Sequence, residues 1–568
     1  MLAMSLRSAN TRNEISDTSL RAAVSSRAVF FAASALVYTA AIVSATLTLH
    51  PYFSQTWDVN TFIHAARTLS DGSPFDLYAQ SRAAQTWPYA YPPLHAFVVA
   101  VALFVGDLAR GLPEYVWARV PAIIADIGVA LVLFRIVLQK SKDETTARAA
   151  ALLWLFNPIT FYDTAVQGHF ESEWLVFILL AYVWFEDARH IALPTTALAI
   201  AVLFKQIALV FALPVFVHLL VGWLNSWAFG TPGAADRPTD QPTSQSSNKP
   251  TDLILFLLLF ALIAVGICSP FLLYSDDFVY MNLTYVENIP VQTSSWIVTL
   301  LGLTRTAPNV LTSDFVLLRH QMTITILAAL ALALIAARRG WGLYLTATLI
   351  AIAFFLTSKK VMGYYYVMLL PFLLAEVMPR RRFALALITL VAITYLALAP
   401  YYAAWTNHAH WWVYAILGTL NSLFFVWLFW RITTDPSPSL RTSRRTPPDD
   451  AAAVGSLRSA VVVLLGLFAT ATFAAWLQPL LPDNGSPISA PIVAAGMEAN
   501  AGIGFAALVG LSVIASSVAA RLTRWIPGRL PRAASGIGLV FAPLFFSVYT
   551  LTKESTAILE IALKLLGV

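Results

Sequence analysis

The chain has 568 residues, of which 58% are hydrophobic and only 12% are charged, and its net charge is +6. A soluble domain carries about a quarter charged residues, whereas apolar stretches of roughly 17 to 22 residues, the length that spans a bilayer, recur along nearly the whole chain. This composition excludes a soluble protein and predicts an all-α polytopic membrane protein; the basic balance does not indicate nucleic-acid binding, because most Lys and Arg residues lie in short loops between spans.

The N-terminal elements set the orientation. Residues 1–28 carry four arginines, so the positive-inside rule places this tail in the cytoplasm. A span at about 29–49 then leads into a first external loop, residues 50–116. The segment Lys140 to Arg148 is the next cytoplasmic marker, so the helix at about 117–138 runs inward. The shorter apolar run 93–108 therefore makes no net crossing, and we expect it in an external layer of re-entrant or interfacial helices.

The later spans alternate in the same way. A span at about 149–165, with a helix break expected at Asn157-Pro158, runs outward. The spans after it lead to a cytoplasmic linker at 228–252 that is rich in Pro, Thr and Ser. Further on lie an external loop at 273–320, a second cytoplasmic linker at 431–458 and additional transmembrane helices at 459–568. The total is about 13 to 15 crossings. All of the unusual polar clusters fall on the side opposite the basic linkers.

Asp58, in the first external loop, is the candidate catalytic base. The loop is too long for a mere connector. A carboxylate near a low-dielectric boundary can have a raised pKa, which suits it to accept a proton from a sugar hydroxyl. The alternative is structural, because Asp58 could cap a helix that begins at Val59.

The other polar residues on this side suggest substrate contacts. Candidates for binding the acceptor or the sugar are Tyr91, His169, Glu171, Glu287 and Gln292. Candidates for binding a phosphate are Arg319, His320, Lys359, Lys360 and Tyr364. Lys359 and Lys360 break the positive-inside bias, which favours a bound anion, although lysines at an interface also snorkel and tyrosines there form aromatic belts. His169 and Glu171 could equally be an interfacial histidine and a solvated carboxylate, and Glu287 and Gln292 could be solvated loop residues.

Two residues inside apolar runs need partners. Lys205 requires a partner or a route to the interface, and Asp126 is expected to make a helix–helix contact rather than to act in catalysis. No metal-binding motif is present, so we expect no required cofactor, although a divalent metal is compatible with this set of residues.

Several segments, taken in order, resemble the GT-C superfamily of integral-membrane glycosyltransferases. The resembling segments are Trp57-Asp58 with residues 72–78, Tyr91 to Leu94, Arg119 to Pro121 with Asp126, Asn157-Pro158 through Glu171, Phe204-Lys205, and Lys359-Lys360 with Tyr364 to Pro371. They span about residues 30–400. The pattern is most similar to glycosyltransferase family 87, which includes mannosyltransferases that depend on polyprenol-phosphate mannose.

This resemblance implies a GT-C-like catalytic membrane domain at residues 29–430, with Asp58 as the catalytic aspartate. It also implies a polyprenyl-phosphate sugar donor, a lipid or glycolipid acceptor and membrane lipids as partners. His169 and Glu171 match the second external loop, and Lys359, Lys360, Arg319 and His320 would meet the donor phosphate. Transfer would invert the anomeric carbon on the non-cytoplasmic face, in the plasma (inner) membrane if the source is prokaryotic. The usual acidic position near Gly168 is displaced here to Glu171.

The expected sugar is mannose, with glucose or arabinose as alternatives. A transporter or flippase for a lipid-linked saccharide is the alternative from a different class. Transporters of that kind show paired repeats and a midplane site built on broken helices. No repeat is evident in the sequence, and the polar residues gather on one side, which favours an enzyme.

Overall fold

The computed structural model describes residues 26–47, 57–71, 73–83, 88–187, 189–229, 250–285, 296–304, 316–361, 363–398 and 411–434. Every regular element within these ranges is a helix, which confirms the predicted all-α class. Two predicted site residues, Glu287 and Gln292, lie outside the described residues. So do nearly all of residues 1–28, most of both predicted linkers and the whole of 459–568.

A layer of shorter helices follows the first long helix, Ser26–Leu47. It consists of α2 (Trp57–Asp71), η1 (Pro74–Asp76), α3 (Leu77–Ala83), α4 (Leu94–Ala109) and α5 (Glu114–Trp117). In α2 the residues Val59, Phe62 and Ala66 recur at helical spacing and are buried, whereas His64 is exposed. Arg67 of α2 ties the layer together through ion pairs of 2.7 Å with Asp107 and with Glu114.

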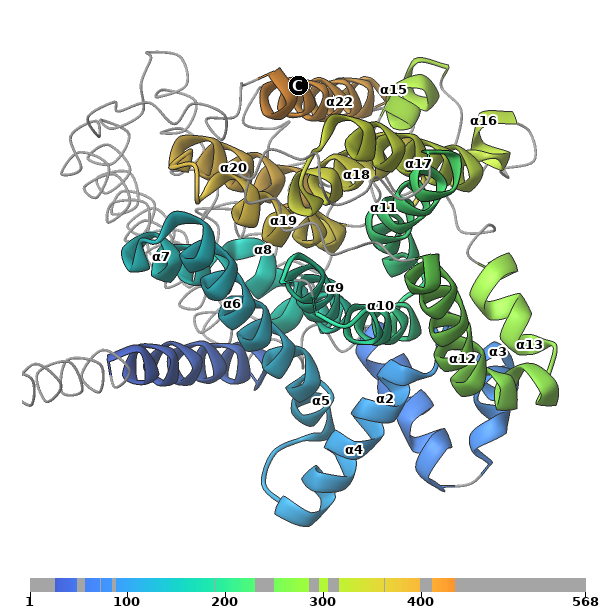
Figure 1. Ribbon diagram of the computed structural model, residues 1–568. Helices are drawn as coiled ribbons and strands as arrows, with labels where there is room; N and C mark the ends of the chain where they lie inside the picture. The colour runs from blue at the N-terminus through green and yellow to red at the C-terminus, as the bar shows by residue number, and fades with distance from the viewer. Residues whose placement is uncertain are drawn as a thin grey trace, which may run out of the picture.

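The remaining helices form the bundle. They are α6 (Val120–Ser141), α7 (Glu144–Leu155), α8 (Pro158–Phe161), η2 (Tyr162–Gln167), α9 (Glu171–Glu186), α10 (Ala192–Phe204), α11 (Ala208–Phe229), α12 (Pro250–Tyr274), α13 (Asp277–Val279), η3 (Tyr280–Thr284), α15 (Trp296–Leu303), α16 (Val316–Arg319), α17 (Gln321–Arg339), α18 (Leu343–Thr357), η4 (Gly363–Met368), α19 (Leu369–Val377), α20 (Phe383–Leu398) and α22 (Trp411–Thr434). Figure 1 shows α9 and α10 at the centre, with α2 and α4 below them and α17 to α22 above.

Five described helices are long and apolar enough to cross a membrane: Ser26–Leu47, Glu114–Ser141, Ala208–Trp227, Thr251–Tyr274 and Gln321–Arg339. Four shorter apolar helices accompany them: Leu94–Ala109, Ala192–Phe204, Leu343–Thr357 and Gly363–Val377. The chain is therefore a multi-pass integral membrane protein. The count of 13 to 15 crossings includes segments outside the described residues and stays a prediction.

The expected span at 149–165 is interrupted at Asn157-Pro158, as the sequence predicted. It is divided into α7, α8 and the π-helical turn η2. The division follows from Asn157-Pro158: the Asn157 carboxamide oxygen accepts the backbone N–H groups of Ile159 and Thr160, each at 2.9 Å, and so caps a new helix. Proline in the first turn of that helix needs no hydrogen-bond acceptor for its nitrogen. The break turns the chain toward Gly168 and His169.

Asp126 of α6 makes the helix–helix contact that the sequence predicted. Its carboxylate accepts the hydroxyl of Tyr38, from helix Ser26–Leu47, at 2.6 Å and the hydroxyl of Thr164, from η2, at 2.7 Å. All three side chains are buried. One carboxylate thus joins three elements.

Replacing Asp126 by Ala should lower the free energy of unfolding by about 1–3 kcal/mol, because two buried hydroxyls lose their acceptor. Asp126→Asn keeps a carbonyl oxygen at the same place and should cost less. Thermal unfolding of the two purified variants in detergent measures the difference. Equal melting temperatures for Asp126→Ala and the wild type would contradict this role.

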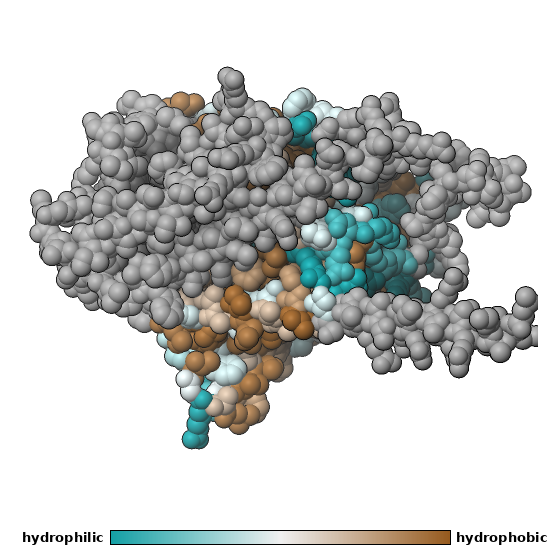
Figure 2. Space-filling view, turned by 90° about the vertical axis from the view of Figure 1, so that its left-hand side faces the viewer, coloured by the Kyte–Doolittle hydropathy of each residue, from teal (hydrophilic) through white to brown (hydrophobic). Residues whose placement is uncertain are grey.

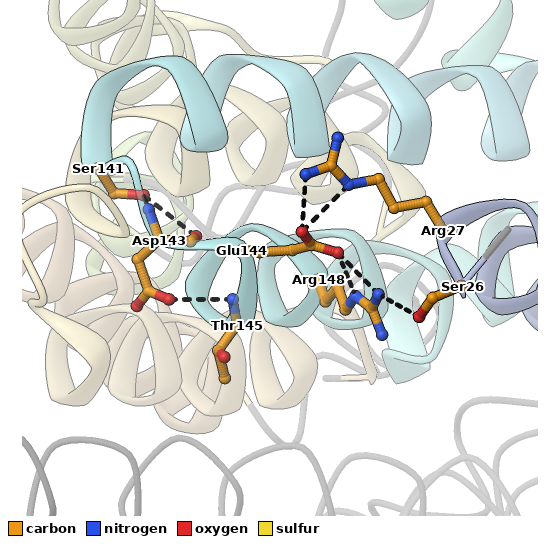
Figure 3. Close-up of polar contacts among 7 residues, drawn as sticks. All are labelled: Ser26, Arg27, Ser141, Asp143, Glu144, Thr145 and Arg148. Atoms are coloured by element: carbon orange, nitrogen blue, oxygen red, sulfur yellow. Dashed lines mark hydrogen bonds and ion pairs between the residues drawn. The ribbon is translucent and has the colours of Figure 1, made fainter. Parts of the chain in front are cut away.

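A second polar cluster joins the first helix to α7 at the end where α6 finishes and α7 begins (Figure 3). Glu144 accepts from Arg27 at 2.7 Å on one oxygen and from Arg148 at 2.7 Å on the other. Arg148 also donates to the Ser26 hydroxyl at 3.0 Å. These groups are partly exposed, so each pair contributes little to stability on its own. Their main effect is to fix the position of the N-terminal helix against α7.

Apolar side chains cover much of the outer surface. The exposed ones on α4 include Val101, Phe104 and Leu108, which recur along one face. Figure 2 shows apolar residues gathered at the lower part of the molecule, at the height where Figure 1 places α4. Such a surface suits contact with lipid hydrocarbon.

Candidate functional site

Several helix ends meet at one place, which we call the site end of the bundle. α9 and α11 begin there, and α10 and α18 finish there. The polar residues next to these ends are His169, Glu171, Lys205 and Lys360, and Asp58 of α2 joins them. Clusters that the sequence placed on one side of the membrane therefore lie together in three dimensions.

Asp58 and His169 form the pair at the centre of the site. Their contact, from Nε2 of His169 to Oδ2 of Asp58, measures 3.0 Å. His169 is fully buried, whereas 22% of the Asp58 side chain is exposed. Asp58 lies in the first turn of α2, and its Oδ2 atom contacts His169. Asp58 is thus the member of the pair that a substrate can reach.

Gly168 allows this pair to form. Its φ of +65° is left-handed, a conformation that favours glycine. A Cβ atom there would overlap the side chain of Val59, the neighbour of Asp58, and would lie 3.0 Å from the guanidinium of Arg119. The absence of a side chain therefore lets α2 approach the turn that carries His169.

Replacing Gly168 by Ala should destabilise the protein more than the same change at Gly340. Gly340 has a φ of +66° but no atom within 4 Å of the position a Cβ would take, so it incurs only the backbone cost of about 1–2 kcal/mol. Gly168→Ala adds a steric overlap of about 1–3 kcal/mol. Melting temperatures of the two variants measure this difference, and equal values would argue against close packing of α2 at Gly168.

The pKa of Asp58 is lowered, whereas it was expected from the sequence to be raised. Burial raises the pKa of this carboxyl, but the charge and hydrogen bond of His169, with the charges of Lys360 and Lys205, outweigh burial, so the pKa is lowered. For His169, burial lowers the pKa despite the opposing effect of Asp58. At neutral pH the pair is therefore a carboxylate that accepts an N–H from a neutral imidazole, and Asp58 is in the form that can take up a proton.

A buried ion pair lies behind Asp58 and His169. Lys205 contacts one oxygen of Glu171, and the indole N–H of Trp174 donates to the other at 2.6 Å. That first oxygen of Glu171 is also 3.9 Å from Nδ1 of His169. Because Glu171 is fully buried and both its oxygens are engaged, the structure favours a role in holding Lys205 over the predicted contact with an acceptor.

Four aromatic rings surround the ammonium group of Lys205. It lies 4.5 Å from the ring centroid of Tyr365, 5.3 Å from those of Tyr91 and Phe170, and 5.7 Å from that of Tyr364. Tyr364 also stacks on His169 at 3.7 Å. The predicted residues Tyr91 and Tyr364 are thus brought to the site, as walls around a cation.

Lys360 supplies a cation beside Asp58. It is partly exposed and lies near enough to Asp58 and Glu171 for their charges to act on it. Burial, with the neighbouring charge of Lys205, lowers the pKa of Lys360 to about 8. The adjacent Lys359 is buried, and its backbone N–H donates to the Gln321 side chain at 3.3 Å.

Arg319 and His320 are not drawn into the cluster. Both are exposed, just before Gln321 at the start of α17. No contact between either of them and Asp58, His169 or Lys360 occurs in the described part of the chain. A phosphate contact by these two residues stays a prediction.

Sequence reasoning missed four residues near the site. Asp163 in η2 is buried, and neither of its carboxylate oxygens has a hydrogen-bond partner among the described residues. His95 and Glu173 form a buried pair at 2.9 Å. Tyr285, partly exposed, lies near enough to Asp58 to interact with its charge. Acidic or histidine residues close to the predicted motifs were the available signal for the first three.

The segment Asn282-Leu283-Thr284, which has the Asn-X-Thr pattern of a glycosylation acceptor, makes contacts within the fold. The Asn282 amide donates to the Phe278 carbonyl at 3.0 Å and accepts from Gln206 at 2.7 Å. Gln206 also donates to the Ala90 carbonyl at 3.0 Å. This network joins η3 to the segments that carry Ala90 and Gln206, next to Lys205, and leaves the asparagine buried. Within the described ranges, no group of three or more His, Cys, Asp or Glu residues is arranged to hold a metal ion.

These observations define a multi-pass helical membrane protein with an ionised carboxylate–histidine pair where several helices end. A model of the family described as GPI transamidase subunit PIG-U matches residues 32–300. The matched part includes Asp58, His169 and Lys205 but ends before Lys360. The comparisons do not confirm the resemblance to glycosyltransferase family 87. No match was found among the curated proteins.

Proposed function

We propose that this chain is a membrane glycosyltransferase that moves a hexose, with mannose as the expected sugar, from a polyprenyl phosphate to a lipid or glycolipid acceptor. The observation that carries the proposal is Asp58, partly exposed and ionised beside neutral His169, with the cation of Lys360 close by. A carboxylate to accept a proton and a cation to meet a phosphate are the two groups that this reaction needs. The reaction would take place on the non-cytoplasmic face.

The proposed step is a single displacement. The acceptor hydroxyl oxygen attacks the anomeric carbon as the bond from that carbon to the phosphate oxygen breaks. The hydroxyl proton passes to Asp58, and the bonding electron pair leaves with polyprenyl phosphate. Phosphate leaves well without a strong acid, and Lys360 stabilises its increased negative charge. One displacement inverts the anomeric centre.

Transfer of labelled mannose from polyprenyl-phosphate mannose to a membrane lipid extract tests the proposal. Donors that carry glucose or arabinose serve as matched controls for the sugar, and addition of a chelator tests for a divalent metal. We expect mannose to be transferred by the purified wild-type protein. Absence of transfer from every lipid-linked donor by folded protein would remove the proposal.

The pH dependence of transfer should report Lys360. Because its pKa is lowered to about 8, the side chain is cationic below that pH and neutral above it. Transfer should therefore fall above pH 8, by about tenfold per pH unit if the cation is essential. Asp58, whose pKa is lowered, stays ionised at pH 5, so no loss is expected between pH 5 and 7.

The Lys360→Arg variant provides the check, because arginine remains charged at high pH. The fall in activity should move to higher pH. Lys142→Arg, at the exposed turn between α6 and α7, serves as the matched control and should keep the wild-type profile. A wild-type profile that stays flat to pH 9.5 would exclude an essential Lys360 cation.

The family match supports a second candidate, a non-catalytic subunit of a membrane complex. In that case the same site would bind a glycolipid without transferring sugar. Retention of a labelled glycolipid by the wild type, with no transfer from any donor and with migration as part of a larger complex in native membranes, would favour this candidate over the enzyme.

A further inference from the structure

A second histidine–carboxylate pair lies next to the first, and the proposed reaction makes no use of it. His95, in the first turn of α4, contacts Glu173, in the first turn of α9, over 2.9 Å between Nδ1 and Oε2. Their side chains are only 2% and 3% exposed. Because neither can meet a substrate directly, any effect on the reaction must pass through a neighbour.

Phe170 is the neighbour that links the two pairs. Its ring stacks on His95 with centroids 3.7 Å apart and planes 12° apart. The ring of His169, the preceding residue, is nearly parallel to it at 5.9 Å. The backbone N–H of Glu173 donates to the carbonyl of Phe170 at 3.0 Å. The ring of Phe170 is therefore held by the His95 ring, which the Glu173 side chain contacts in turn.

Phe62 closes the arrangement from α2. It lies one turn after Asp58 and makes edge-to-face contacts with His95 at 4.6 Å, Phe170 at 5.2 Å and His169 at 5.8 Å. The same face of α2 thus carries the carboxylate of the first pair and the ring that contacts the second. A change in the plane of the His95 ring would displace rings that contact His169.

We propose that His95 and Glu173 are positioning residues that hold Phe170, and through it His169, where His169 donates to Asp58. The hydrogen bond to Glu173 fixes the plane of the imidazole, and the imidazole plane fixes that of Phe170. An aromatic hydrocarbon ring in place of His95 would fill the space, but without the hydrogen bond to Glu173 its orientation would not be fixed. The effect on catalysis rests on the proposed function, whereas the effect on Asp58 does not.

The test uses the double variant His95→Phe/Glu173→Leu, which keeps a ring against Phe170 and leaves no buried carboxylate without a partner. The kcat for sugar transfer should fall by about 10- to 100-fold while KM for the donor stays unchanged, because the loss is one of alignment. His64→Gln, at an exposed position of α2, is the matched control and should behave as the wild type.

The second readout is the titration of Asp58 itself, followed by its carboxyl infrared or carbon NMR signal and assigned with Asp58→Asn. His169 is the strongest influence that lowers the pKa of Asp58, against burial, which raises it, while Lys360 and Lys205 face the same carboxyl. Displacement of His169 should therefore raise the pKa of Asp58 and move the acid limb of kcat to higher pH. A purely structural role in the core would leave both unchanged.

The outcomes separate the two proposals. The positioning role would be overturned if the double variant had the same kcat, the same acid limb and the same Asp58 titration as the wild type. A raised pKa of Asp58 in the variant, with no transfer by the wild type, would support the positioning role and exclude the proposed glycosyltransferase activity. If the double variant does not fold, His95→Gln, which can still donate to Glu173 but offers no ring to Phe170, is subjected to the same two measurements with the same expectations.

Discussion

Replacing Asp58 by Asn is expected to lower the rate of sugar transfer by roughly 10²–10⁴-fold. The amide has nearly the shape of the carboxylate but cannot take up the proton of the acceptor hydroxyl. Asp58 is the ionised and partly exposed member of its pair, and His169 is buried behind it, so no other group of the pair can replace it at the substrate. Turnover of labelled donor under saturating conditions measures the effect.

The matched control is Asp276→Asn, which removes an exposed carboxylate that makes no capping hydrogen bond. It should transfer at the wild-type rate. Asp58→Asn should melt within a few degrees of the wild type, because the position is partly exposed and tolerates an isosteric amide. Equal transfer by Asp58→Asn and the wild type would exclude Asp58 from the mechanism and would favour a binding subunit.

Loss of the Lys205 cation is expected to have the largest effect on stability. Lys205→Met keeps the length of the side chain but leaves the carboxylate of Glu171 buried without its cation. Breaking a buried pair in this way costs about 3–5 kcal/mol. Unfolding in detergent should therefore begin at a much lower temperature.

The double variant Lys205→Met/Glu171→Gln should recover most of that loss. The glutamine can still accept the indole N–H of Trp174, and methionine packs well against the aromatic rings that surrounded the ammonium group. Arg82→Met is the control for a surface pair: its contact with Asp277 is half-exposed, and the change should cost less than about 1 kcal/mol. A double variant as unstable as Lys205→Met would show that the buried charge on Glu171 is not the cause.

Charge patterns in the sequence singled out several residues that the structure brings together. Asp58 drew attention because its loop was too long for a connector, and Lys360 because it broke the positive-inside bias; the structure brings the two close together. The partner of Lys205 could also have been inferred. In an antiparallel pair of helices, the start of α9 lies beside the end of α10, which places Glu171 next to Lys205.

The rest of the candidate site depends on contacts between helices, which the spacing of apolar residues along the chain does not reveal. His95 lies inside an apolar run, and its pairing with Glu173 requires α4 to cross the start of α9. The raised pKa expected for Asp58 was wrong in direction because burial was considered without the partners that the fold supplies. The helix break at Asn157-Pro158 was predicted from the sequence, whereas the π-helical turn η2 that follows it was not.

The separation of Asp58 and His169 by 111 positions in the chain has a consequence for biosynthesis. A ribosome delivers α2 to the membrane well before His169, and Lys360 emerges much later still. During that interval the residue that Asp58 contacts in the folded protein is absent, so this contact can form only after α2 has been made. Fragments that end near residue 300 would carry Asp58, His169 and Lys205 but would lack Lys360. Such fragments would therefore lack the positive charge that lies near Asp58 in the full chain.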